Sequence, residues 1–198
     1  MHMNKTALIL ELHEIGLIKF GSFVFKSGIV SPNYLDHRIL VSYPKTLQKI
    51  ADAYITILNK LTFDRMIAIP YTAMPIVGAI SLKNGKPWIY TRKESKGYGT
   101  NKMIEGIYSK GETAILVDDV ITTGGSKFET VEKLKQEELH IHDVVVFIDR
   151  QQGGREEVEK RGMELHSVLT LTEIFDTLLK AGTLTKEQYT INMKSINT

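Results

Sequence analysis

Residues 114–126 read Ala-Ile-Leu-Val-Asp-Asp-Val-Ile-Thr-Thr-Gly-Gly-Ser. The apolar run Ala114–Val117 is too short and too rich in β-branched side chains for a helix, and it predicts a buried parallel strand. Two adjacent carboxylates follow the run, and a Thr/Gly/Ser turn then opens onto a helix-like stretch, Lys127–Glu138. This order places polar groups at the carboxyl end of a strand, where parallel sheets bind their ligands.

The stretch offers two kinds of ligand chemistry side by side. The carboxylates of Asp118 and Asp119 can accept hydrogen bonds from a pair of vicinal hydroxyls. Residues 122–126 can surround a phosphate with backbone N–H groups, hydroxyls and the positive end of the following helix. Gly124 and Gly125 suit this role because glycine permits positive φ and a close approach of the backbone to an anion. A ligand that carries a diol beside a phosphate is a ribose 5-phosphate.

The same thirteen residues resemble the phosphoribosyl-pyrophosphate signature of the type I phosphoribosyltransferases. The resemblance implies that this substrate contacts Asp118, Asp119, Val120, Ile121, Thr122, Thr123, Gly124, Gly125 and Ser126. The plainer alternative is a strand–turn–helix with an acidic corner, which any α/β protein can carry. Two other phosphate loops do not fit, since no G-x-x-x-x-G-K-[ST] occurs and Gly97-Tyr98-Gly99 lacks the third glycine of a dinucleotide fingerprint.

Composition places the chain among ordinary globular proteins. Of its 198 residues 42% are hydrophobic and 24% are charged, and the net charge of +2 is too small to indicate a nucleic-acid partner. The absence of cysteine excludes disulfides and thiolate chemistry and is compatible with a reducing compartment. No apolar stretch has the length of a membrane span, and the first residues lack the apolar core of a signal peptide. We therefore expect a cytoplasmic protein without a membrane partner.

The rest of the chain alternates between helix-like and strand-like stretches. This alternation predicts an α/β protein with a doubly wound, mainly parallel sheet and helices on both faces. No repeat, linker or shift in composition divides the chain, so we expect one domain over residues 1–198. The expected helices are 4–15, 44–61, 74–82, 127–138, 155–161 and 172–179, with Thr172 as an N-cap and Thr185–Gln188 as a capping box. The expected strands are 23–25, 66–69, 87–90, 114–117 and 144–148.

The stretch between Tyr90 and Thr113 has weak periodicity and begins with a cluster of cations. A loop of this length in a compact domain is usually functional or disordered. The cations and intervening glycines suit a mobile lid that closes over a polyanion such as pyrophosphate. The alternative is a solvated charge run. The cations are Arg92, Lys93, Lys96 and Lys102.

Three further segments resemble orotate phosphoribosyltransferases. Residues 25–28 (Phe-Lys-Ser-Gly) and 31–38 (Ser-Pro-Asn-Tyr-Leu-Asp-His-Arg) resemble the N-terminal signature of that family. The cations of residues 92–99 resemble its catalytic lid, and residues 149–154 (Asp-Arg-Gln-Gln-Gly-Gly) resemble the motif that closes its base pocket. The resemblance implies a type I phosphoribosyltransferase fold with a small hood, contributed mainly by about residues 1–40.

The resemblance also implies roles for individual residues. The expected catalytic residues are Lys96, Lys93, Arg92, Asp118 and Asp119. Further contacts to phosphoribosyl pyrophosphate are expected from Lys26, Tyr71, Thr72 and Tyr98. Orotate is expected to contact Lys26, Tyr34, Leu35, Thr122 and Arg150. Thr72 and Tyr98 stand where the common short bacterial enzymes carry lysine and histidine, and both choices are similar to those in the transferase half of UMP synthase.

Some of these side chains have plainer explanations. Arg150 has a planar guanidinium that suits a planar carboxylate substrate, but it could instead form a structural pair with Asp149. Tyr34 could stack on the orotate ring or fill the core, and Lys26 could be an ordinary turn lysine.

The resemblance implies a reaction and its requirements. The phosphoribosyl group passes to orotate and pyrophosphate leaves, with Mg²⁺ bound mainly through pyrophosphate and the ribose diol near Asp118 and Asp119. The family's lid reaches the neighbouring subunit's site, which implies a homodimer. One rival is another type I phosphoribosyltransferase of purine or uracil salvage, which is expected to lack residues 26–28 and 149–154 of this pattern. The other is a non-catalytic regulator that senses phosphoribosyl pyrophosphate, which would need an added nucleic-acid-binding element.

Overall fold

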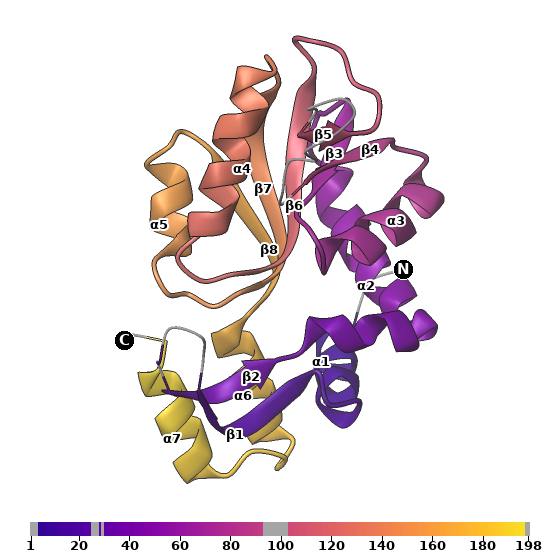
Figure 1. Ribbon diagram of the computed structural model, residues 1–198. Coiled ribbons are helices and arrows are strands. Elements are labelled where there is room, and N and C mark those ends of the chain that lie inside the picture. The colour runs from indigo at the N-terminus through magenta and orange to yellow at the C-terminus, as the bar shows by residue number, and fades with distance from the viewer. Residues whose placement is uncertain (1–3, 25–27, 29, 93–102, 197–198) are drawn as a thin grey trace.

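The computed structural model describes residues 4–24, 28, 30–92 and 103–196. Its larger part is a six-stranded sheet in the order β5-β4-β3-β6-β7-β8 (Figure 1). All neighbouring strands are parallel except β4 and β5, which are antiparallel. The strands are β3 (Arg65–Ala68), β4 (Trp88–Thr91), β5 (Ile104–Glu105), β6 (Thr113–Ile121), β7 (His140–Asp149) and β8 (Glu164–Thr170). The chain winds outward in both directions from β3 and β6, so the switch point of this sheet lies between them.

Helices cover both faces of the sheet. On one face α2 (Pro44–Leu58) and α3 (Ala73–Asn84) pack on the alternate β6 residues Ile115 and Val117. On the other face α4 (Gly125–Gln136) and α5 (Gly154–Glu159) pack on Ala114 and Leu116. Each parallel strand is thus apolar on both sides, as strands between two helical layers must be. The predicted α/β fold class is confirmed.

A smaller part lies below the sheet, and we call it the hood. It contains the antiparallel pair β1 (Ile18–Val24) and β2 (Val30–Leu35), with α1 (Lys5–Glu14), α6 (Leu171–Lys180) and α7 (Lys186–Lys194) around them (Figure 1). The sequence predicted a hood mainly from residues 1–40, but the two C-terminal helices also belong to it. Nζ of Lys5 lies 2.7 Å from Oε1 of Glu173, and Nδ2 of Asn33 donates to Oδ1 of Asn192 over 3.0 Å.

The 3-10 helix η1 (His37–Ser42) connects the hood to the sheet. It follows β2 directly and leads into α2, whose first residue is the predicted Pro44. Because β2 ends at Leu35, the residues at the start of η1 lie where the hood meets the carboxyl ends of the strands. This position brings η1 to the candidate site.

Several predicted boundaries can be compared with the structure. The capping box of Thr185 and Gln188 at the start of α7 is confirmed. The N-cap of α6 is Thr170 and not Thr172, because the side chain of Thr170 accepts the N–H of Glu173 while Glu173 bonds back to Thr170. Strand β8 was not expected, and β6 continues through the acidic pair to Ile121. Across the described residues, no helix combines the length and apolar character that crossing a membrane requires.

Candidate active site

A cavity of about 640 Å³ opens at the carboxyl ends of β3 and β6, the switch point of the sheet. Its wall includes Ile69 and Pro70 after β3, Thr91 of β4, and the loop between β6 and α4. Nine of the residues predicted to bind phosphoribosyl pyrophosphate line it: Thr72, Arg92, Asp118, Asp119, Val120, Thr122, Thr123, Gly124 and Gly125. The structure therefore assembles most of the predicted ribose and phosphate site in one place.

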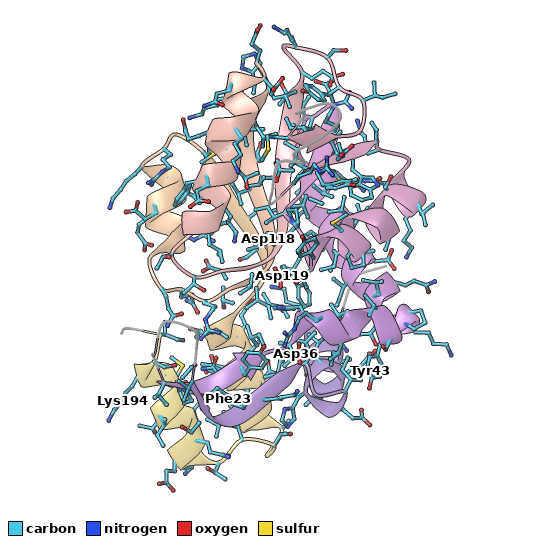
Figure 2. The ribbon with its side chains drawn as sticks, viewed as in Figure 1. Phe23, Asp36, Tyr43, Asp118, Asp119 and Lys194 are labelled. Carbon is cyan, nitrogen blue, oxygen red and sulfur yellow. The ribbon has the colours of Figure 1, made fainter. Side chains whose placement is uncertain are left out.

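The two carboxylates of the acidic pair share a hydrogen bond but differ in their other partners. Successive residues of a strand alternate between faces, and the pair lies inside β6 rather than after it. Asp118 pairs with Lys127 of α4, whereas Asp119 contacts His37, whose ring packs on Phe147. Figure 2 shows both at the junction between the sheet and the hood. As a result, the two carboxylates have different partners.

Asp118 is held from two sides and is buried. Its Oδ2 lies 2.7 Å from Nζ of Lys127, and its Oδ1 accepts the N–H of Asp119 over 2.9 Å. Burial raises the pKa of Asp118 to about 7, and the charge of Asp119 adds to this while Lys127 opposes it. Tyr54 of α2 also donates its hydroxyl to the carbonyl of Asp118 over 2.6 Å. Asp118 is therefore anchored in the structure of the loop.

Asp119 has two side-chain partners. Its Oδ2 lies 3.0 Å from Nδ1 of His37, and its carboxylate also shares a hydrogen bond with the side chain of Asp118. Burial acts to raise the pKa of Asp119, but the hydrogen bonds and charges of its surroundings, His37 first among them, lower it to about 2. Asp119 thus presents an ionised carboxylate oxygen at the cavity, suited to accept a ribose hydroxyl.

The loop after β6 is shaped to receive a phosphate. Gly124 has φ of +85°, and a side chain there would come within 2.7 Å of the ring of Phe128. The loop then enters α4, a 12-residue helix whose first N–H groups have no partner within the helix. Lys127 supports the loop from inside, because its Nζ donates to the carbonyl of Val120 over 2.6 Å as well as pairing with Asp118.

The motif of residues 149–154 packs against the same loop. A Cβ atom at Gly154 would lie 2.5 Å from the carbonyl oxygen of Thr122 and 2.6 Å from Ile121. The backbone N–H of Arg150 donates to the carbonyl of Ile121 over 3.0 Å. The predicted base-pocket motif is thus in direct contact with the predicted phosphate loop.

Three residues that were predicted to contact the substrate do not line the cavity. The side chain of Ile121 is fully buried in the core, so only its backbone belongs to the site. Tyr71 is 69% exposed and does not line the cavity. Ser126 lies in the first turn of α4.

Arg92 is the one predicted lid residue within the described part of the chain. Its Nη1 lies 3.1 Å from Oε1 of Glu105, at the rim of the cavity. Lys26, Lys93, Lys96 and Tyr98 lie outside the described residues.

The residues predicted to bind orotate are not gathered in this cavity, apart from Thr122. Arg150 is buried, its Nε donates to Gln152 over 2.9 Å, and burial lowers its pKa. The ring of Tyr34 stacks on Phe23 at 5.4 Å between centroids, and its hydroxyl accepts from Arg38 over 2.6 Å. Leu35 packs against the core.

Three residues that contact the acidic pair were not predicted: His37, Tyr54 and Lys127. Lys127 directly follows the phosphate loop, so its position next to the site could have been inferred from the sequence. His37 belongs to the segment 31–38, but nothing in its local pattern indicates a contact with residue 119, which lies far along the chain. Tyr54 was predicted as part of the apolar face of its helix, where a hydroxyl needs a buried acceptor.

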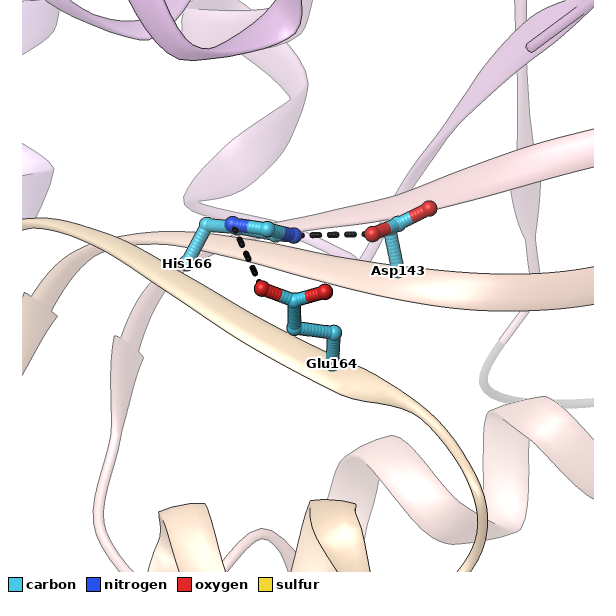
Figure 3. A group of neighbouring side chains, drawn as sticks. All are labelled: Asp143, Glu164 and His166. Atoms are coloured by element: carbon cyan, nitrogen blue, oxygen red, sulfur yellow. Dashed lines mark hydrogen bonds and ion pairs between the residues drawn. The ribbon is translucent and has the colours of Figure 1, made fainter. Parts of the chain in front are cut away.

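A second group of titratable side chains lies on β7 and β8. Nε2 of His166 lies 2.8 Å from Oδ1 of Asp143, and its Nδ1 lies 3.8 Å from Oε1 of Glu164 (Figure 3). The imidazole therefore lies between the two carboxylates, with one nitrogen toward each. One ligand atom from each of the three side chains lies within 4.8 Å of the other two, and we interpret these residues as a hydrogen-bonded cluster.

Comparisons with known proteins agree with this geometry. Residues 39–172 match the family described as phosphoribosyl transferase domain. An orotate phosphoribosyltransferase from Methanopyrus kandleri is 39% identical over 174 residues, which cover 88% of this chain and 93% of the relative. The structure of Leishmania donovani UMP synthase superposes with a TM-score of 0.89 and 34% identity, over 98% of this chain and 42% of that one.

The chain also matches longer proteins. The uridine 5′-monophosphate synthase of Bos taurus is 40% identical over 170 residues, which are 85% of this chain. The chain spans only 35–39% of the length of such synthases.

The fold, the cavity and these matches define the class: the chain belongs to the phosphoribosyltransferase family. Within that family its relatives of similar length place it with the orotate phosphoribosyltransferases.

Proposed function

We propose that the protein transfers the 5-phosphoribosyl group from phosphoribosyl pyrophosphate to orotate, which gives orotidine 5′-monophosphate and pyrophosphate in pyrimidine biosynthesis. One observation carries the proposal: an ionised carboxylate and a glycine-rich helix start line the same cavity. The relatives named orotate phosphoribosyltransferase support orotate as the acceptor.

Different residues of the cavity bind different parts of the substrate. Oδ1 of Asp119 accepts from the ribose diol, and the loop of residues 122–125 with the start of α4 holds the 5-phosphate. The C1–O bond then breaks toward a cationic centre at C1, and orotate nitrogen N1 attacks from the opposite face. Arg92, together with Lys93 and Lys96, stabilises the negative charge that grows on the leaving pyrophosphate.

Mg²⁺ belongs to the same proposal. Its preferred ligands are oxygens, and here the substrates' phosphate and hydroxyl oxygens would supply most of them. The described residues fit the ion, because the carboxylate of Asp119 is ionised and lines the cavity. Asp119 would contact the ion through water. When bound, the metal would neutralise part of the pyrophosphate charge.

The test is the loss of orotate absorbance when phosphoribosyl pyrophosphate and Mg²⁺ are supplied together to purified protein. Turnover must need all three components and must yield orotidine 5′-monophosphate, identified by mass. Uracil, adenine and hypoxanthine are offered in parallel reactions. If one of these bases reacts and orotate does not, the protein is a salvage enzyme. If phosphoribosyl pyrophosphate binds but no base reacts, it is a sensor.

The proposal includes a homodimer in which the lid, which contains residues 92–99, reaches the partner's cavity. The support is the resemblance of the lid sequence to the family's lid. We also propose a cytoplasmic location, which cell fractionation tests directly.

A further inference from the structure

His37 connects the hood to the acidic pair. It is the first residue of η1 and follows hood strand β2 by two residues. Its ring reaches across to β6, where Nδ1 lies 3.0 Å from Oδ2 of Asp119. The side chain is only 1% exposed, so solvent does not compete for this contact. A buried imidazole thus lies behind the carboxylate that we assign to the ribose.

The surroundings of His37 fix which nitrogen carries the proton. The carboxylate of Asp119 only accepts hydrogen bonds at this pKa, so Nδ1 must be the donor. Nε2 is buried and has no hydrogen-bond partner among the described residues. The ring packs edge-on against Phe147, with centroids 6.0 Å apart and planes at 79°. A proton on Nε2 would therefore be a buried donor without an acceptor, which is costly.

The contact also orients the carboxylate. Because His37 binds Oδ2, the other oxygen of Asp119 is the one left for the cavity. Strand β2, which leads into His37, carries Tyr34 and Leu35, two of the residues expected to contact the base. A movement of the hood would therefore be transmitted through His37 to the carboxylate that binds ribose.

We propose that His37 is a positioning residue: by donating a hydrogen bond from Nδ1, it holds Asp119 in the orientation that accepts the ribose diol. The inference rests on the proposed function of the cavity. It assigns no proton transfer to His37, which does not line the cavity.

Two substitutions test the roles of the two ring nitrogens of His37 separately. In His37→Asn the side-chain amide falls near the position of Nδ1 and can still donate to Asp119. In His37→Gln the amide falls near the position of Nε2 and cannot replace that donor. Both are polar and uncharged, so they differ mainly in where the donor lies. His37→Leu removes both nitrogens and keeps the apolar packing.

The expected result is a selective effect on one substrate. Loss of a hydrogen bond to a charged group typically changes binding by on the order of tenfold or more. We expect KM for phosphoribosyl pyrophosphate to rise by about that factor in His37→Gln and His37→Leu, while His37→Asn stays within about threefold of wild type. KM for orotate should change less than KM for phosphoribosyl pyrophosphate in every variant. Thermal unfolding identifies any variant whose loss is merely structural.

A second measurement does not depend on turnover. A long-range ¹H–¹⁵N spectrum of the free protein should show a proton on Nδ1 of His37. A ring protonated on Nε2 alone would overturn the proposal. So would equal losses in the Asn and Gln variants, or a wild-type KM in the Leu variant.

The outcomes also distinguish this inference from the proposed function. If wild-type protein does not turn over orotate, the proposed reaction is wrong. The role of His37 is then decided by the dissociation constant of phosphoribosyl pyrophosphate with Mg²⁺ in the same variants, and by the spectrum.

Discussion

The ammonium of Lys127 lies 2.7 Å from Oδ2 of Asp118, and both side chains are more than nine-tenths buried. Lys127 belongs to α4 and Asp118 to β6, so this ion pair joins the strand to the helix across the phosphate loop. The sequence predicts the same role for both carboxylates of the acidic pair, as catalytic residues that contact the substrate. The ion pair indicates that Asp118 also stabilises the fold, and that Asp119→Asn is the cleaner test of ribose binding.

We expect Lys127→Met to lower the free energy of unfolding by about 3 kcal/mol at pH 8, because it leaves a buried carboxylate without its cation. The loss should be smaller at pH 6, since burial already raises the pKa of Asp118 to about 7 and its protonation relieves the unpaired charge. Urea unfolding at both pH values measures this. Lys135→Met, at an exposed site of the same helix, is the control and should change stability by less than about 0.5 kcal/mol. Equal effects of the two substitutions would contradict the assignment.

The pKa of Asp119 predicts a pH dependence of stability. In the folded protein it is lowered from 3.8 to about 2, so Asp119 adds stability above about pH 4 and loses it as the pH falls toward 2. The contribution is about 2 kcal/mol. The raised pKa of Asp118 acts between about pH 4 and 7 and does not overlap with this window. Urea unfolding between pH 5 and 2 should therefore show a steeper loss in wild type than in Asp119→Asn. Parallel curves would disprove it.

The contact of Gly154 with Thr122 predicts that residue 154 controls the phosphate loop. Gly154→Ala would place a methyl group 2.5 Å from the carbonyl of Thr122, so the loop must shift. We expect the dissociation constant of phosphoribosyl pyrophosphate to rise by on the order of tenfold, as for a contact worth about 1.4 kcal/mol. Gly78→Ala is the matched control, since a Cβ at that helical site meets nothing within 4 Å. Isothermal titration decides, and an unchanged affinity in Gly154→Ala would show that the loop adapts.

Arg150 remains the predicted determinant of orotate selectivity. We expect Arg150→Leu to reduce kcat/KM for orotate by two orders of magnitude or more, because a guanidinium that binds the orotate carboxylate discriminates strongly against substrates without one. Binding of phosphoribosyl pyrophosphate should change little. Arg150 donates a hydrogen bond to Gln152, so Gln152→Leu tests whether this bond is needed to position the guanidinium. Orotate turnover within about threefold of wild type in Arg150→Leu would make Arg150 structural.

Lys96 tests the lid and the dimer together. We expect Lys96→Ala to lower kcat by on the order of a hundredfold and to affect orotate binding much less, because a lid cation acts mainly on the leaving charge. Mixed with Asp119→Asn, it should recover part of the activity through hybrid dimers. If subunit exchange is verified and no mixture recovers activity, the lid does not cross the interface.

Much of the fold could be predicted because its signals are local. The apolar runs of β3, β6 and β7 and the amphipathic α2 are each readable within their own residues. The edge strand β8 was missed because polar residues such as Glu164 and His166 interrupt its apolar pattern. The N-cap of α6 could have been found, since Thr170 and not Thr172 stands three residues before Glu173.

The sequence predicts most residues of the candidate site, but it does not predict that Asp118 and Asp119 have different roles. The run of residues 118–126 identifies a ribose phosphate site, whereas the different partners of Asp118 and Asp119 depend on tertiary contacts with Lys127 and His37. The partner of Asp119 is His37, which lies 82 residues earlier in the chain. Contacts over such separations leave no local pattern, which also explains why Tyr34 and Arg150 could not be placed from sequence.

The hood is built from both ends of the described chain, and this has a consequence for the order of folding. The buried bond between Asn33 and Asn192 joins residues 159 positions apart, and the hairpin β1–β2 packs beside α7. A two-stranded hairpin is marginal by itself. During synthesis, the sheet from β3 to β8 can therefore collapse first, while the hairpin waits for α7 to leave the ribosome. A ribosome-stalled chain in which β8 has left the exit tunnel while α7 is still inside it should protect the amides of β6 and β7 from hydrogen exchange and leave those of β1 and β2 unprotected.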